Sequence, residues 1–207
     1  MTLRLAAAMS VFIGIATFLV YLQLLGKGPL ANPVSRHLRA GKDRGTSPPA
    51  ASPIDHPAMF LLPRRAPLAT IGPIEARGVT LEGYVQRIRH AVDNDFHLDV
   101  AAEPRGPDGA PQPYAVAEIT PRWRAGSSNW GYERLLATLR PNRGGATPWD
   151  QGPSRVRFTG WLLYDYQHEH RLPRPGRPVA VAAWELHPVT RIELWSDSLG
   201  RYMEYPR

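Results

Sequence analysis

The sequence contains no cysteine among its 207 residues. This absence excludes a disulfide framework, a thiolate metal ligand and a catalytic thiol, and it leaves the redox compartment undecided. Any metal ion therefore has to be bound by histidine and carboxylate side chains. Catalytic signatures are missing as well. There is no glycine-rich phosphate loop and no HExxH helix, and GSSNWG at 126–131 lacks the GxSxG spacing of a nucleophile elbow.

A broad excess of basic residues is missing from most of the chain, although the net charge is +7. Residues 1–77 carry nine basic and three acidic residues, whereas residues 78–207 carry 16 and 15. Nucleic-acid binding draws much of its affinity from neutralised phosphates. The near-neutral second part therefore argues against nucleic acid as a partner.

One long hydrophobic run is present, LAAAMSVFIGIATFLVYLQLL at residues 5–25. At about 1.5 Å per residue, such a helix spans roughly 30 Å of hydrocarbon. A secretory signal peptide has a shorter apolar region and a small-x-small cleavage site, which does not follow here. We therefore expect residues 1–25 to be an uncleaved anchor of a single-pass membrane protein.

The orientation of this anchor is set by two opposing features. The basic residues after the run favour a cytoplasmic domain under the positive-inside rule. The very short tail before the run and the long domain after it favour a signal anchor with the domain outside. We expect a periplasmic or otherwise extracytoplasmic C-terminal domain.

Residues 26–77 contain nine prolines and no sustained periodicity. This composition is typical of an extended, semi-rigid spacer, so we expect a Pro/Arg-rich linker. The apolar content rises from Phe60 onward, which indicates that the last part of the linker lies over the following domain.

Residues 78–207 show the alternation of half-buried strands. VTLEGYVQRI, FHLDV and YAVAEIT predict three strands, and Gly83 indicates a bend in the first. Leu135, Leu136 and Leu139 predict a helix, after which VRFTGWLLYDY and PVAVAAWELHPVTRIELW predict two more strands. The order β-β-β-α-β-β predicts a five-stranded OB-like barrel, whose closure removes exposed edges. An open α+β sandwich is the alternative.

Several segments resemble a group of uncharacterised bacterial extracytoplasmic proteins with an OB-like domain. They are DNDFHLDV, Glu118 in the third strand, VRFTGWLLYDYQH and WELHPVT. The group shares an acid-x-His-Leu segment, a Val-x-x-Thr-Gly strand ending in Asp and His, and a closing Glu-Leu-His-Pro. The resemblance covers residues 78–194. It implies an extracytoplasmic location and no particular reaction.

An OB barrel presents ligands on its second and third strands and on the loops that join strands one to two and four to five. Those loops correspond here to residues 90–95 and 168–178. The segment YDYQHEH leads from the fourth strand into the second loop. The predicted ligand-binding rim comprises His97, Asp99, Glu118, Tyr164, Asp165, His168, His170, Arg171, Arg174, Glu185 and His187.

Three hypotheses compete for this rim. His168 and His170, with His97, could bind a divalent metal ion. Alternatively, the basic residues could bind an anion or a sugar, with Trp161, Tyr164 and Trp184 as aromatic platforms. The third hypothesis is a solvated loop without a ligand. Within the strands, Glu185 and His187 share one face and are expected to form a hydrogen-bonded network.

We therefore expect a membrane-tethered OB-like binding or interaction module. Its partner would be a protein, an oligosaccharide or a small anionic ligand, and no cofactor is predicted beyond the divalent metal of the first hypothesis. The alternative is a metal-dependent phosphoester hydrolase. It would use His97, Glu118, His168, His170 and His187.

Overall fold

The computed structural model describes residues 13–21, 32–104, 112–141, 153–166 and 180–207. The chain divides into two compact units, residues 1–43 and residues 44–207. The second unit contains all the strands described below.

The first unit contributes two helical segments. Residues 13–21 are helical and expose their side chains. Helix α2 (Pro33–Lys42) begins at Asn32, whose side chain accepts a hydrogen bond from the backbone N–H of Ser35 at 2.8 Å. This N-cap and the proline in the first turn are ordinary helix start signals. These start signals were not used when an extended spacer was predicted for this segment.

The expected anchor at residues 5–25 lies outside the described residues except for 13–21. Among the helices that the structure describes, none combines the length and the apolar character required to cross a bilayer.

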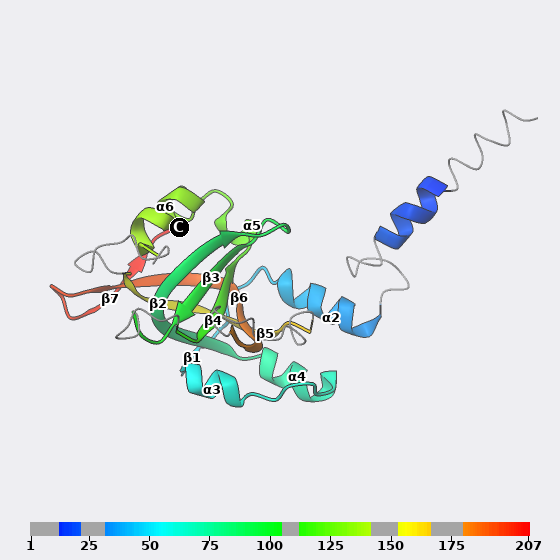
Figure 1. Cartoon of the computed structure of the whole chain (residues 1–207), viewed down its shortest axis with the longest axis horizontal. Helices are drawn as coiled ribbons and strands as arrows, with labels where there is room; N and C mark the ends of the chain where they lie inside the picture. Colours follow the sequence, from blue (N-terminus) through cyan, green and yellow to red (C-terminus); the bar gives the residue numbers. More distant parts are fainter. Residues whose placement is uncertain (1–12, 22–31, 105–111, 142–152, 167–179) are drawn as a thin grey trace, which may run out of the picture. The chain divides into compact units, whose positions relative to one another are not determined.

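Five strands of the second unit form a closed barrel (Figure 1). Their order around the barrel is β2-β3-β4-β6-β5, and β5 pairs back with β2. The β4–β6 pair is parallel and the other four pairs are antiparallel. The strands are β2 (Gly78–His90), β3 (Phe96–Ala101), β4 (Tyr114–Ile119), β5 (Arg155–Tyr164) and β6 (Ala180–Ser196). This arrangement confirms the predicted OB-like barrel.

The first barrel strand changes its neighbour near Gly83. Residues 78–84 of β2 pair with β5, whereas residues 84–90 pair with β3. A Cβ atom at Gly83 would lie 2.3 Å from the carbonyl oxygen of Ala101 on β3. Glycine therefore permits the close approach of the two strands at the predicted bend.

Helices lie on opposite sides of the barrel (Figure 1). On one side, α5 (Pro121–Arg124) and α6 (Tyr132–Leu139) connect β4 to the segment before β5, and Leu135 and Leu139 are fully buried. Trp123 and Trp130, in the segment between β4 and α6, are also buried. Trp149 lies outside the described residues.

The expected linker at 26–77 contributes elements to the barrel unit from residue 44 onward. Strand β1 (Ser52–Ile54) pairs in parallel with β2, and helices α3 (His56–Leu61) and α4 (Leu68–Glu75) follow it. Met59 and Ile71 are fully buried in the core. The local start signal of α3 is an Asp-x-Pro sequence, which the high proline content of the segment concealed from an analysis of composition.

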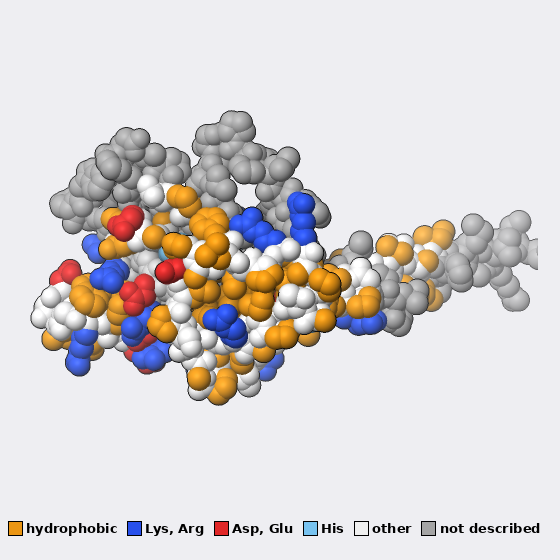
Figure 2. Space-filling model, turned by 90° about the horizontal axis from the view of Figure 1, so that it is seen from below, with side chains coloured by type: hydrophobic (Ala, Val, Ile, Leu, Met, Phe, Trp, Pro, Cys, Tyr) orange, Lys and Arg blue, Asp and Glu red, His pale blue; other side chains and the backbone are white. Residues whose placement is uncertain are grey.

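The C-terminal strand β7 (Arg201–Tyr205) forms a hairpin with β6 and was not predicted. Side chains of both charge signs lie side by side on the face in Figure 2, at the end where β6 and β7 lie. Arg157 binds Glu193 at 2.8 Å and Arg191 approaches Glu204 at 3.3 Å. The described part of this end therefore presents mixed charge rather than a basic surface.

Candidate functional site

Five titratable side chains converge on the outer face of β3, β4 and β6. We name them the acid–imidazole cluster. It comprises Asp95, His97, Glu118, Glu185 and His187. The second and third strands of an OB barrel are β3 and β4 here, so the cluster lies on the face where this fold presents ligands.

Strand alternation accounts for this placement. Ala117 and Ile119 belong to the hydrophobic core, so Glu118 between them points to the opposite face of β4. His97 is the direct cross-strand neighbour of Glu118. Leu186 likewise belongs to the core and pairs in register with Ala117, which places His187 beside Glu118.

Glu118 stands at the centre of the cluster. Its Oε1 lies 3.1 Å from Nε2 of His97, and its Oε2 lies 2.8 Å from Nδ1 of His187. Oε1 of Glu185 lies 3.3 Å from the same Nδ1 atom. On the other side of the His187 ring, Oδ2 of Asp95 lies 3.8 Å from Nε2.

Burial makes these contacts strong. The side chains of Glu118 and His187 are both 0% exposed. Burial of His187 opposes its positive charge, but the attraction and hydrogen bonding of Glu118, and then of Glu185, outweigh it and raise the pKa of His187 to about 10. His187 is therefore an imidazolium at neutral pH, held between carboxylates.

The composition of the cluster decides which ligands it can accept. It brings three carboxyl side chains together with two imidazoles. Such a set attracts cations and hydrogen-bond donors and disfavours a bare anion. The predicted anion rim relied on basic residues of the loop after β5. Of these, His168, His170, Arg171 and Arg174 lie outside the described residues.

The structure brings four predicted rim residues together, namely His97, Glu118, Glu185 and His187. The expected shared face of Glu185 and His187 is present, and both residues contribute to one network. His97 does not pair with Asp99, two positions along the same strand. Its carboxylate neighbour is instead Glu118 on the adjacent strand, because side chains directly opposite each other come closer than side chains two apart on one strand.

Asp99 has separate partners. Its carboxylate lies 2.6 Å from Nη2 of Arg87 and 3.0 Å from Nη2 of Arg89, both on β2. The side chain of Asp99 is only 2% exposed, so it does not lie on a solvated face as the alternation suggested. Asp99 stabilises the β2–β3 pair rather than the acid–imidazole cluster.

Tyr164 and Asp165 were expected on an open rim, yet both are buried. The hydroxyl of Tyr164 accepts a hydrogen bond from the backbone N–H of Arg65 at 2.8 Å, and its ring lies 5.2 Å from that of Trp184. Trp184 is also fully buried. The segment after α3, expected as linker, binds both rings, because Trp184 donates to the carbonyl of Pro63 at 2.8 Å. Neither ring is available as a platform for a sugar.

Asp95 is the cluster residue that the sequence analysis missed. It ends the loop 91–95 between β2 and β3, is 6% exposed, and lies two positions before His97. The loop itself was expected to flank the ligand face. The sequence did contain a signal for Asp95, namely a carboxylate in this loop two positions before His97 on the following strand.

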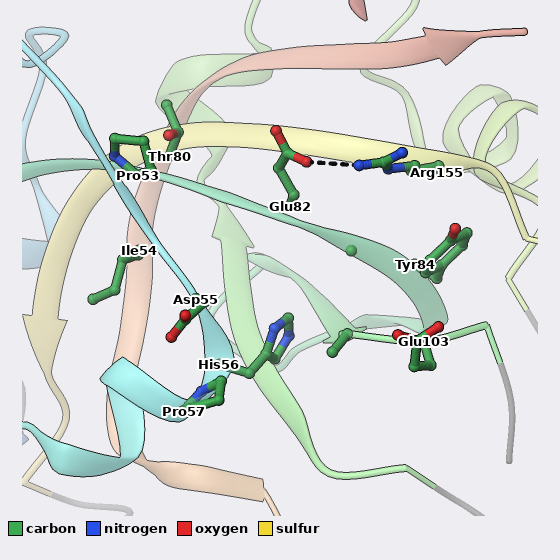
Figure 3. Close-up of a pocket in the computed structure, with 12 residues that line it drawn as sticks. Pro53, Ile54, Asp55, His56, Pro57, Thr80, Glu82, Tyr84, Glu103 and Arg155 are labelled. Atoms are coloured by element: carbon green, nitrogen blue, oxygen red, sulfur yellow. Dashed lines mark hydrogen bonds and ion pairs between the residues drawn. The ribbon is translucent and has the colours of Figure 1, made fainter.

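A second concave feature lies away from the cluster. It is an open hollow of about 580 Å³ between β1, β2 and the adjoining ends of β3 and β5 (Figure 3). Three of its charged residues are engaged in contacts within the fold. Asp55 accepts a hydrogen bond from the backbone N–H of Ala58 at 2.7 Å, and Glu82 binds Arg155 at 3.1 Å. We therefore assign the hollow to the packing of β1 and α3 on the barrel.

Comparisons with known proteins leave the family open, since no family model matches the chain and no curated protein is significantly similar to it. The asparaginyl-tRNA synthetase of Entamoeba histolytica in complex with asparaginyl-adenylate is similar at 16% identity and a TM-score of 0.38, over 76% of this chain and 25% of that chain. Another structure of that synthetase gives 15% identity and a TM-score of 0.36, with the same two coverages. The chain thus spans about a quarter of the length of these proteins. Likeness at this level carries no argument about function, and the expectation against nucleic acid stays a prediction.

The cluster predicts a large energetic response to the loss of its cation. His187→Gln leaves the carboxylates of Glu118 and Glu185 buried without the imidazolium, so we expect a loss of about 3–5 kcal/mol in the free energy of unfolding. Urea unfolding of the full-length chain in detergent, followed by tryptophan fluorescence, measures it. Glu204→Gln removes an exposed ion pair as a control and should cost less than about 1 kcal/mol. Equal effects of the two substitutions would contradict a buried cluster.

His56 predicts an acid-sensitive step in stability. Burial lowers the pKa of His56, although its hydrogen bond to the carbonyl of Val100 at 2.9 Å and the nearby Asp55 act in the opposite direction. The unfolded chain therefore takes up the proton more readily. This contribution is present above the unfolded pKa of about 6.5 and is lost as the pH falls through the lower folded pKa.

His56→Gln keeps a hydrogen-bond donor and removes the titration. We expect the variant to lose less stability than the unmodified chain between about pH 7.5 and about pH 5, as measured by urea unfolding. Comparison of the two proteins cancels the contributions of the other titrating groups. If the free energies of unfolding of the two proteins fall in parallel with pH, His56 has the same pKa in the folded and unfolded states and the prediction is wrong.

Proposed function

We propose that this protein is a membrane-tethered binding module whose ligand face is the outer surface of β3, β4 and β6. One observation carries the proposal. Side chains from three strands, β3, β4 and β6, and from the β2–β3 connection converge on the face that OB barrels use for ligands. Folding alone requires no such cluster, because apolar residues of similar size serve a barrel equally well.

The tether is supported by the uncharged run at residues 5–25. Residues 13–21 within it are helical, and their large apolar side chains are exposed, such as Ile13 at 58% and Phe18 at 59%. A bilayer would cover these side chains. The proposed location of the domain is the extracytoplasmic side.

Fusion of a reporter enzyme that folds only outside the cytoplasm to Arg207 tests this arrangement. We expect reporter activity, together with retention of the fusion in the membrane fraction after an alkaline carbonate wash. Deletion of residues 1–25 should remove both signals. A silent reporter on a membrane-retained chain would reverse the orientation, and release of the intact chain by carbonate would contradict the tether.

The binding function predicts stabilisation by a ligand without turnover. The full-length chain in detergent should show a concentration-dependent rise in Tm with a member of a defined panel of oligosaccharides, small anions and peptides. Glu118→Gln alters the centre of the face. The apparent Kd obtained from the concentration dependence of Tm should increase at least tenfold in this variant. Glu204→Gln, at an exposed carboxylate on β7, is the matched control and should leave it unchanged.

The same protein should be assayed with a chromogenic phosphodiester in the presence of Zn²⁺ and of Mn²⁺. Hydrolysis that is lost in Glu118→Gln would favour the phosphoester hydrolase, because His97, Glu118 and His187 of that alternative do lie together. A response to neither the panel nor the phosphodiester would contradict the proposed ligand face.

A further inference from the structure

Both ring nitrogens of His187 are buried and lack a hydrogen bond of good geometry among the described residues, and one of the two has no close oxygen either. That nitrogen is Nε2. The other ring nitrogen, Nδ1, is occupied by Glu118 at 2.8 Å and Glu185 at 3.3 Å. The carboxylate of Asp95 faces Nε2 at 3.8 Å, which is beyond hydrogen-bond distance. A buried polar atom in this state indicates that a further group belongs between Nε2 and Asp95.

The spacing between Nε2 and Asp95 suits a metal ion, which would displace the Nε2 proton of the imidazolium to solvent on binding. One ligand atom each from Asp95, Glu118 and His187 lies within 4.8 Å of the other two. Ligands on one ion with bonds of about 2.1 Å lie up to about 4.2 Å apart. The distance of 3.8 Å between Nε2 and Oδ2 already falls within that span. Glu118 contacts Nδ1 in this structure, so it would have to turn one oxygen toward the ion and leave Nδ1 to Glu185.

The surroundings match the way proteins hold metal-binding histidines. A ligating imidazole usually donates its second N–H to a carboxylate, which fixes the ring and increases its basicity. Glu185 is placed to accept from Nδ1 of His187 in this manner, at 3.3 Å. His97 contacts the central carboxylate, Glu118, at 3.1 Å. The excess of carboxylates over imidazoles supplies the negative charge that a dication requires.

We infer that Asp95, Glu118 and His187 form a binding site for a divalent transition-metal ion, with Glu185 and His97 as positioning residues. Nitrogen and oxygen donors without sulfur suit Zn²⁺ or Mn²⁺. The set differs from the predicted one, which used His168, His170 and His97. The inference rests on the proposed function in that it takes this face as the ligand face.

Titration of the chelator-treated, full-length chain with ZnSO4 and with MnCl2 tests the site, by calorimetry and by elemental analysis after desalting. We expect one ion per chain. Asp95→Asn is the decisive variant, because Asp95 lies at the edge of the network and is the ligand whose loss least affects folding. It should weaken binding at least tenfold while the circular dichroism spectrum is retained. Glu185→Gln should weaken binding about 10- to 100-fold through the orientation of His187.

Two further variants locate the ion. Glu204→Gln, at the exposed carboxylate, should bind as the unmodified chain does. His168→Ala/His170→Ala should retain the ion. Loss of binding in that double variant with full binding in Asp95→Asn would assign the metal to the loop and overturn the inference. Substoichiometric binding by the unmodified chain would also overturn it.

An anomalous-scattering measurement at the zinc edge gives a direct position. The expected peak lies at a bonding distance of about 2.0–2.1 Å from Nε2 of His187. A peak elsewhere contradicts the site. If the ion is absent and an oligosaccharide, anion or peptide still raises Tm, the metal site fails while the binding function stands. If the ion binds and no panel ligand does, the binding function fails instead.

Discussion

The parallel pairing of β4 with β6 is the constraint on which the site depends. It closes the barrel between strands that are far apart in the sequence, and its register aligns Val116 with Glu185 and Ala117 with Leu186. Because side chains alternate along a strand, a shift by one residue would turn Glu118 or His187 into the hydrophobic interior. The core residues on both strands therefore fix the register, and the register places the imidazolium beside its carboxylate.

The barrel and the cluster make opposite energetic contributions. Interior positions such as Leu98 and Phe158 remove apolar surface from water, which stabilises the fold. Burial of charged groups on the outer face costs free energy that only good ion-pair geometry offsets. Glu118 approaches a histidine nitrogen with each of its oxygens, at 3.1 and 2.8 Å, which offsets part of that cost. The network is thus tolerated by the fold rather than required for it.

Strand periodicity predicted the barrel well, because Val79 and Leu81 or Leu98 and Val100 alternate plainly with polar neighbours. It predicted the shared face of Glu185 and His187 for the same reason. It did not predict that the polar face is buried, as the position of Asp99 shows. Burial depends on elements that pack from elsewhere in the chain, and local alternation carries no information about them. The helices before residue 78 were missed because composition was weighed above capping signals such as Asp55.

The position of Asp95 favours the interpretation of the cluster as a binding site over its interpretation as a purely structural network. Glu118 and the two histidines are enough to link β3, β4 and β6, since Glu118 contacts a histidine on each neighbouring strand. Asp95 adds a third buried carboxylate from a loop, and its Oδ2 faces Nε2 of His187 at 3.8 Å. This extra negative charge weakens a closed network and strengthens a site for a cation. The loop that flanks the ligand face of the fold is therefore also the part of the cluster that a bound ion would complete.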